Sequence, residues 1–377
     1  MTYSRFKSIA LLLSALSIVG CSTLAKKSDT GVVVARRAQI RSSTAVVAAD
    51  LLEVNRGEAV DILDSVDVPD PSDNTKKERW LRVRAHNEQS TEGWIEARNV
   101  MLQEVLESAK KLADEDKGIP AQATGQLHAG SNLRLTPDRA GNENIIMRLD
   151  SGSTFEITGW KRVPRPKGSE APETDTAPKA GSAPVTKNRN ESDEEKQPEE
   201  TNELWYKVRL PPSFSPAPAG WIYGKQVELS VPSDIIFYRT GREFVAWQRL
   251  DGDSSSTDSS SKGKDAAKES RPGSWVILEK SSSDQPHTLD EPDFDRIYVL
   301  GYDKRDQDHY TSYRSPDLKG FLPCRVEGSG QNKTFTIRVQ DESGQTKEVQ
   351  YSLYRDARGY LKVNAPSAAP KETKKKK

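Results

Sequence analysis

Cysteine and histidine are the scarcest reactive residues in this chain of 377 residues, which has two cysteines and four histidines. With Cys21 in the N-terminal segment, Cys324 has no partner for a disulfide within the folded part. Four histidines without a pair at helical spacing leave zinc without a ligand set. Neither a glycine-rich phosphate loop nor a serine nucleophile motif occurs. We therefore expect a protein that is not an enzyme and has no metal site and no cofactor.

The chain also lacks an excess of charge of either sign, because 56 basic residues balance 56 acidic ones. No overall field attracts nucleic acid or anionic lipid. Only 34% of the residues are hydrophobic, and the mean hydropathy is -0.75. This composition is too polar for one packed globule of this length, so we expect two or three domains with linkers. The basic tail at 364–377 is interpreted as a solubilising end.

The first residues, 1–21, have the pattern of an export signal. Arg5 and Lys7 precede an apolar run that is too short for a stable membrane span. The run ends in Ile18-Val19-Gly20-Cys21, which resembles the lipobox of bacterial lipoproteins. That resemblance implies lipidation of Cys21 and a membrane anchor. Ser22 stands where an inner-membrane lipoprotein often has Asp, which favours the outer membrane, facing the periplasm. A plain secretory signal is the alternative.

Three segments have the composition of linkers, namely a tether at 22–31, an insert at 164–203 and a second insert at 251–273. They are rich in Pro, Ser, Glu and Lys and poor in large apolar side chains, so we expect disorder there. By contrast, 103–120 has apolar residues at spacings of three and four, which predicts a short linker helix that ends before Gly118 and Pro120. A helix that pairs with another subunit is an alternative.

A repeat dominates the first two thirds of the chain. "EGWIEARNVML" returns as "AGWIYGKQVEL", and "WLRVR" returns as "WYKVR". Alternation in these blocks places Trp80, Arg82 and Arg84 on one face of a strand, with Leu81 and Val83 on the other. Four blocks recur in order, and the extra residues of the second copy fall between its second and third blocks. The first copy has a polar stretch there, "DSVDVPDPSDNTKKER", which is interpreted as a loop.

Glycine takes fixed positions in both copies. Gly57 and Gly152 stand where a turn needs a positive φ, and a glycine before Trp94 and Trp221 allows the closing strand to approach its neighbour closely. This order of blocks resembles the bacterial SH3 family, over 32–102 and again over 121–230, although Ile40 and Leu133 replace the usual Val. The resemblance implies two small SH3-like barrels and a role in binding cell-wall peptides.

The last part, 231–363, continues as short alternating strands without a repeat, from "DIIFYR" to "GYLKV". Seven to nine strands predict an antiparallel sandwich or barrel, and it resembles no family that we recognise. The chain as a whole is therefore predicted to be all-β.

Each candidate functional residue also has a structural interpretation. Cys324 with His309 or His287 is the one candidate for a nucleophile, but a cysteine after an apolar run is typical of a core. Asp303, Asp306 and Asp308 lie in a predicted turn without the order of a calcium loop. The aromatic positions of the barrels, with nearby polar residues, are the candidates for ligand contact. They are Trp80, Trp94, Arg98, Trp205, Trp221 and Tyr223, of which Arg98 and Tyr223 are expected to be the most exposed.

The sequence thus predicts a lipid-anchored protein of the cell envelope that binds without catalysis. Its partners are expected to be the membrane, through the lipid on Cys21, and either peptidoglycan or an envelope protein, with no nucleic acid. One alternative is a scaffold that binds only proteins. The other is a cell-wall hydrolase that uses Cys324.

Overall fold

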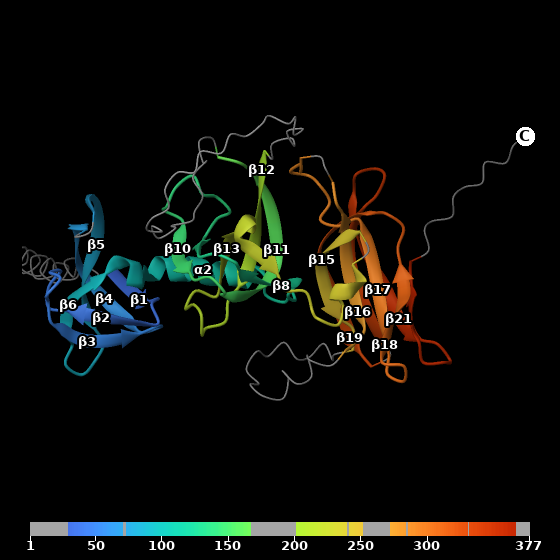
Figure 1. Ribbon diagram of the computed structural model, residues 1–377, viewed down its shortest axis with the longest axis horizontal. Helices are drawn as coiled ribbons and strands as arrows, with labels where there is room; N and C mark the ends of the chain where they lie inside the picture. The colour runs from blue at the N-terminus through green and yellow to red at the C-terminus, as the bar shows by residue number, and fades with distance from the viewer. Residues whose placement is uncertain are drawn as a thin grey trace, which may run out of the picture. The chain divides into compact units, whose positions relative to one another are not determined.

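The computed structural model describes residues 29–70, 73–166, 201–239, 241–251, 272–283, 286–330 and 332–366 (Figure 1). They form antiparallel sheets and a single α-helix, which confirms the all-β prediction. The chain divides into two compact units, 1–106 and 107–377. The signal segment with Cys21, most of the tether and the basic tail lie outside the described residues. In the described part, no helix has the length and apolarity needed to cross a membrane.

The first unit is a curled sheet of seven strands in the order β3-β2-β6-β5-β4-β1-β7 (Figure 1). A hydrophobic cluster between Val33 and Val100 fills its interior, with Ile40, Val83 and Ile95 fully buried. The strands are β1 Asp29–Val33, β2 Arg37–Arg41, β3 Asp50–Asn55, β4 Ala59–Asp70, β5 Asp73–Ala85, β6 Glu92–Glu96 and β7 Val100–Leu102, with the 3-10 helix η1 Ala97–Asn99 before β7.

The second unit starts its own sheet of seven strands with the same order of counterparts, β10-β9-β13-β12-β11-β8-β14. The register is also repeated, because Trp80 pairs with Glu96 as Trp205 pairs with Tyr223. The tandem repeat is thus present in the fold, while its membership of the bacterial SH3 family stays a prediction. The strands are β8 Ala123–Leu127, β9 Ser131–Arg134, β10 Ile145–Leu149, β11 Thr154–Pro164, β12 Asn202–Arg209, β13 Ala219–Tyr223 and β14 Val227–Leu229, with η2 Gly224–Gln226 before β14.

The repeated glycines have the geometry that the sequence predicts. Gly57 and Gly152 have φ of +89° and +79°, a region that L side chains rarely adopt. A Cβ on Gly93 would lie 2.5 Å from the carbonyl oxygen of Arg41, and one on Gly220 would lie 2.6 Å from Leu133 Cδ1. The closing strands β6 and β13 therefore need glycine where they cross β2 and β9.

Strands extend into two segments that the sequence predicted to be irregular. The polar stretch of the first copy is not a loop, because β4 and β5 continue through it, with Val66 opposite Trp80 and an Asp67–Arg79 ion pair of 2.9 Å. Cross-strand pairs thus stabilise a ribbon in which the sequence shows little hydrophobicity. Likewise, Pro164 and Asn202 are paired strand residues, although we expected disorder from 164 to 203. The rest of that insert, 167–200, lies outside the described residues, as do 252–271 of the second insert.

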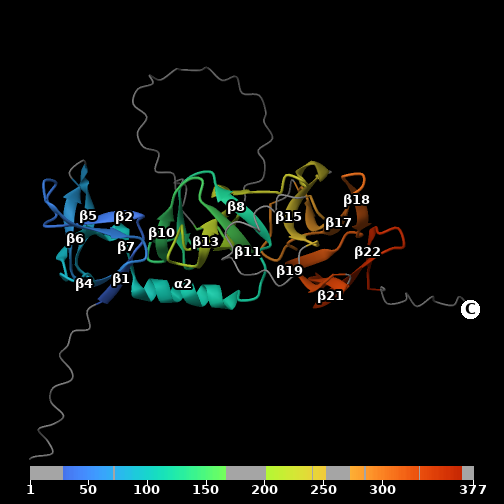
Figure 2. The same cartoon turned by 90° about the horizontal axis from the view of Figure 1, so that it is seen from below.

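The single helix, α2, spans Gln103–Glu115 and ends before the predicted limit at 120, with Gly118 at a φ of +87°. Its C-terminal end is fixed to the second repeat, below which it runs in Figure 2. Lys207 Nζ lies 2.9 Å from Glu115 Oε2 and 3.0 Å from Asp116 Oδ1, and Thr158 Oγ1 donates to Asp116 at 2.7 Å.

The C-terminal part is a sandwich of two four-stranded antiparallel sheets, β15-β16-β17-β18 and β19-β20-β21-β22. One buried cluster draws side chains from both sheets, such as Val299 and Phe335. Two separate sheets that pack on a shared core form a sandwich and not a barrel. The strands are β15 Arg242–Arg249, β16 Trp275–Ser281, β17 Arg296–Asp303, β18 Asp308–Arg314, β19 Lys319–Ser329, β20 Asn332–Gln340, β21 Thr346–Arg355 and β22 Leu361–Asn364.

One predicted strand of this part is wrong. "DIIFYR" forms a 3-10 turn, η3 Ile236–Tyr238, because the N–H groups of Ile235 and Ile236 both bond the carbonyl of Pro232. Asp234 in the same turn accepts a hydrogen bond from Trp275 Nε1 at 2.8 Å. The turn thus places the carboxylate of Asp234 against Trp275 of the sandwich.

Gln122 connects the second repeat to the sandwich. Its side chain is fully buried, and its Oε1 accepts from the N–H of Cys324 at 2.7 Å while its Nε2 donates to the carbonyl of Cys324 at 3.0 Å. The carbonyl of Gln122 accepts from the N–H of Trp247 at 2.9 Å. One amide side chain therefore pairs with β19 as a neighbouring strand would.

Glu279 on β16 is a fully buried carboxylate, and neither oxygen has a hydrogen-bond partner within the described residues. Burial raises its pKa above the ordinary value of 4.5, against the opposing effect of nearby arginines such as Arg314. Since the folded pKa exceeds the unfolded one, ionisation removes stability as pH rises from about 4.5 through the folded pKa. We expect Glu279→Gln to stabilise the protein at pH 7 by on the order of 1 kcal/mol, and not at pH 4.

Urea unfolding of both proteins at the two pH values measures this difference. Glu348→Gln, on an exposed position of β21, is the control and should change little at either pH. A gain from Glu279→Gln that is equal at pH 4 and pH 7 would show that ionisation is not the cause.

Candidate functional site

The outer face of β5 and β6 in the first repeat carries two of the predicted ligand residues, Trp80 and Trp94. Directly paired residues project to the same side of an antiparallel sheet. Trp80 pairs with Glu96, Arg82 with Trp94 and Arg84 with Glu92, so these six share the outer face. Leu81 and Val83 project into the core, as the alternation predicts.

Charged side chains on this face pair with each other and stay in solvent. Arg82 Nη2 lies 3.0 Å and Arg84 Nη2 2.7 Å from the two oxygens of Glu92, and all three side chains are 35 to 49% exposed. The hydrogen bond from Arg84 is the main cause that lowers the pKa of Glu92. Because these side chains are partly exposed, a ligand can reach them.

Trp80 and the loop after β2 are joined through Arg41. The guanidinium of Arg41 lies 5.9 Å from the centre of the Trp80 ring and donates to the carbonyls of Val46 at 2.7 Å and Ala48 at 3.1 Å. The loop is therefore ordered, yet it exposes Val46 by 71% and Val47 by 94%. Sequence reasoning missed this apolar tip, although two adjacent valines in a polar loop are a detectable signal. We name Trp94, Arg98, Val46 and Val47 the open surface.

The counterpart face of the second repeat is covered from two sides. At one end, Arg139 lies 4.8 Å above the Tyr223 ring and binds Glu203 with contacts from 2.6 to 3.1 Å. The side chains of Arg139 and Glu203 are only 7% and 3% exposed. At the other end, the C-terminal end of α2 pairs with Lys207. This face offers little surface to a ligand.

The candidate residues therefore differ between the repeats. Trp205 is fully buried and Tyr223 is 8% exposed, which corrects the expectation that Tyr223 is exposed, because Arg139 lies over its ring. Trp221 is half-buried. In the first repeat Trp94 is half-buried and Trp80 is buried beneath Arg41. Arg98 is 70% exposed and pairs with Glu96 at 2.7 Å and Glu78 at 3.4 Å.

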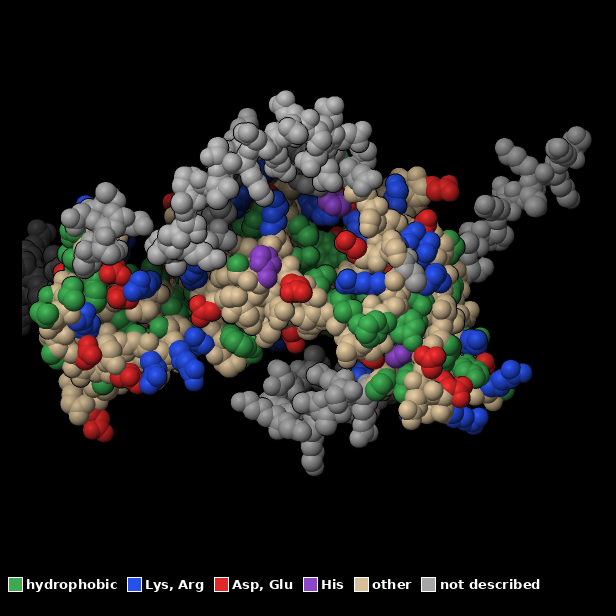
Figure 3. Space-filling model, viewed as in Figure 1, with side chains coloured by type: hydrophobic (Ala, Val, Ile, Leu, Met, Phe, Trp, Pro, Cys, Tyr) green, Lys and Arg blue, Asp and Glu red, His purple; other side chains and the backbone are tan. Residues whose placement is uncertain are grey.

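The charges around the open surface are balanced, as they are over the face of the molecule in Figure 3, where acidic and basic side chains are interspersed. Arg82 and Arg84 are matched by Glu92, and Arg98 by Glu96, both carboxylates of β6. Such a surface suits a ligand with both polar and apolar groups, such as an extended peptide, better than a polyanion.

Cys324 lies in the core of the sandwich. Its side chain is 1% exposed, and burial raises the pKa of the thiol to about 12. A thiolate nucleophile needs a lowered pKa and access to substrate. In a chain that starts at Ser22, we expect Cys324 to react with a chromogenic disulfide reagent at pH 8 only after denaturation. Full reaction of the native protein within minutes would show that the thiol is accessible.

The acidic turn is also structural. Asp303 accepts from the N–H of Arg305 at 2.8 Å, and Asp308 accepts from the hydroxyl of Tyr238 at 3.1 Å. Among the residues that the structure describes, no group of three His, Cys, Asp or Glu could hold a metal ion.

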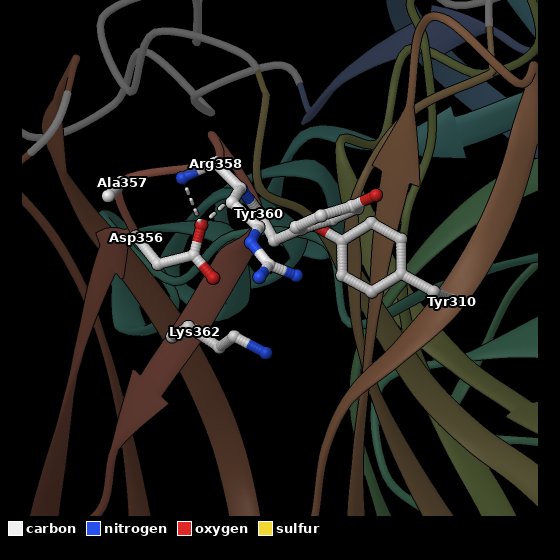
Figure 4. A pocket seen from close by; sticks show the side chains of 6 residues that line it. All are labelled: Tyr310, Asp356, Ala357, Arg358, Tyr360 and Lys362. Atoms are coloured by element: carbon white, nitrogen blue, oxygen red, sulfur yellow. Dashed lines mark hydrogen bonds between the residues drawn. The ribbon is translucent and has the colours of Figure 1, made fainter.

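A hollow of about 480 Å³ lies beside the β21–β22 turn, lined by Tyr310, Asp356, Ala357, Arg358, Tyr360 and Lys362 (Figure 4). The carboxylate of Asp356 accepts from the N–H groups of Arg358 and Tyr360 at 2.9 and 3.0 Å. The Tyr310 hydroxyl accepts from the N–H of Leu361 at 2.6 Å, and the two tyrosine rings meet edge to face. These groups hold the turn together, so the hollow is weak as a candidate site.

Comparison with known proteins leaves the family of this chain open. No family model matches it, and neither does any curated protein. Similar solved structures include NlpC1 and NlpC2 from Trichomonas vaginalis, each at 10% identity and a TM-score of 0.15, covering 90% of this chain and 94% and 93% of theirs. An NlpC/P60 endopeptidase from Photobacterium damselae subsp. piscicida matches at 11% identity and a TM-score of 0.18, over 97% of this chain and 70% of its own. TM-scores this low carry no argument about shared fold or activity.

Proposed function

We propose that the protein is a noncatalytic binding protein of the cell envelope, held at the membrane by lipid on Cys21, and that its first repeat binds an extended peptide. The ligand is either a stem peptide of peptidoglycan or a segment of an envelope protein. The open surface is the observation that supports this proposal. The corresponding face of the second repeat is covered by the protein's own side chains, so we assign binding to the first repeat.

The chemistry of the open surface supports a peptide. Val46 and Val47 offer apolar contact on an ordered loop, where exposed valines would otherwise have no stabilising role. Trp94 adds a half-buried ring that can pack against a side chain or peptide plane. Arg98 and Glu92 offer hydrogen bonds to peptide groups at the rim.

Cosedimentation with purified sacculi tests the wall version of the proposal, using the chain from Ser22 to Lys377. We expect retention that resists high salt and falls at least about tenfold in Val47→Asp, since a charge on the apolar tip is costly to bury. Phe237→Asp is the matched control, because Phe237 is 89% exposed on η3, which belongs to neither repeat's sheet, and the variant should be retained normally.

Retention no greater than that of an unrelated lipoprotein would exclude peptidoglycan. Crosslinking in cells then separates the two ligand classes. A single protein adduct that is lost in Val47→Asp supports an envelope protein, and a series of muropeptide adducts supports the wall. Equal behaviour of Val47→Asp and the unchanged protein in both assays would refute the open surface as the binding site.

A further inference from the structure

A second cavity, of about 240 Å³, lies between the second repeat and the sandwich, within the unit 107–377. One wall is the hairpin of β11 and β12, where Trp160 pairs directly with Tyr206 and Arg162 with Leu204, so these four side chains share one face. The opposite wall is the edge strand β15, with Glu243 and Val245, and the end of β16, with Lys280. Its volume suits a small ligand.

The aromatic wall is held in place. Trp160 Nε1 donates to Asp293 Oδ1 at 2.6 Å, and the other oxygen of Asp293 accepts from the N–H of Leu322 at 2.9 Å. The Trp160 and Tyr206 rings meet edge to face, with centres 6.1 Å apart. Because its N–H is already bonded, Trp160 has only its ring left to contribute to a ligand.

The basic groups of the cavity share one carboxylate as their partner. Glu291 lies 2.7 Å from Lys280 Nζ, 2.7 Å from His287 Nδ1 and 3.5 Å from Arg162 Nε. Burial acts to raise the pKa of Glu291, but the hydrogen bonds from Lys280 and His287 outweigh it and lower that pKa. Lys280 also donates to the carbonyl of Pro292 at 2.7 Å, so its hydrogen bonds are largely used.

Some polar groups of the cavity have no hydrogen-bond partner among the described residues, and the Tyr206 hydroxyl and the Glu243 carboxylate are two of them. Burial raises the pKa of Tyr206 to about 12, so its hydroxyl stays protonated and can donate. Glu243 is exposed at the rim and can only accept when ionised. Tyr206 and Glu243 thus offer a donor and an acceptor beside an aromatic wall.

The charges decide which ligand fits. Arg162 and Lys280 repel an ammonium group, and the carboxylate of Glu243 repels an anion. A neutral molecule with an apolar face and several hydroxyls meets neither penalty, since its face packs on Trp160 and its hydroxyls reach Tyr206 and Glu243. We propose that this cavity binds a single neutral sugar ring.

Saturation-transfer NMR with N-acetylglucosamine and glucose as probes tests the proposal on the chain from Ser22 to Lys377. We expect saturable, millimolar binding of at least one of them. Tyr206→Phe and Glu243→Gln should each weaken it about 3- to 10-fold, the effect of one hydrogen bond. Tyr354→Phe and Glu348→Gln, both on exposed positions of β21, are the matched controls and should bind as the unchanged protein does.

Three results would overturn the proposal, namely no saturable binding of either sugar, equal binding by all four variants, or tighter binding of Nα-acetyl-lysine amide than of the sugars. None of them depends on the open surface of the first repeat. Val47→Asp should leave sugar binding unchanged, so failure here and failure of the proposed peptide site remain distinguishable.

Discussion

Gln122→Ala is expected to lower the free energy of unfolding by about 3 to 5 kcal/mol. The substitution leaves the N–H and the carbonyl of Cys324 buried without their partners, and each unsatisfied group costs about 1 to 3 kcal/mol. The small cavity left by the side chain adds to the loss. Urea unfolding followed by tryptophan fluorescence measures the change in the chain from Ser22.

Gln126→Ala is the matched control for this prediction. Gln126 lies on β8, which begins directly after Gln122, but its side chain is partly exposed and, among the described residues, bonds Glu228 at 3.3 Å. We expect it to cost less than about 1 kcal/mol. Similar losses for both substitutions would mean that the contact of Gln122 with β19 contributes no more than a surface hydrogen bond.

Arg139→Ala is expected to cost about 3 to 5 kcal/mol, because it leaves the carboxylate of Glu203 buried without its bidentate partner. Arg165, at 4.0 Å from Glu203, is too far away to replace those hydrogen bonds. The loss also uncovers the Tyr223 ring. The same unfolding measurement applies.

The first repeat supplies the control for the buried pair. Arg98 binds Glu78 and Glu96 at the surface, and Arg98→Ala should change stability by less than about 1 kcal/mol. In addition, replacing Arg139 and Glu203 together with leucine should cost less than Arg139→Leu alone, because no charge is left buried. If the double variant is the less stable one, desolvation of Glu203 is not the dominant effect.

The sequence was sufficient to predict the repeated strands and their buried faces, because alternation, turn glycines and the repeated Trp blocks are local signals. Gly57 and Gly93 show this, since their conformation follows from positions that recur in the second copy. It was not sufficient for the ribbon between Asp64 and Arg79. Cross-strand pairs such as Asp67–Arg79 stabilise that ribbon, and pairing across a hairpin is not visible in composition.

The candidate site was predicted only in part, for a related reason. The repeat makes Trp80 and Trp205 look equivalent, and both are indeed buried. The difference between the copies comes from Arg139, which lies in the loop after β9, where the first copy has Val46 and Val47. That loop has no counterpart in the four repeated blocks. Which face is open therefore depends on contacts between segments that are distant in sequence.

The two repeats also differ in how easily recombination could move each of them as an independent domain. The hydrophobic cluster of the first repeat uses only residues between Val33 and Val100, whereas Trp160 of the second packs against the cluster of the sandwich and Gln122 pairs with Cys324. Recombination could therefore duplicate or transplant the first repeat with its own hydrophobic cluster intact. The second repeat can be inherited only together with the sandwich. We expect binding specificity to diversify at the first repeat, while the second and the sandwich evolve as one body.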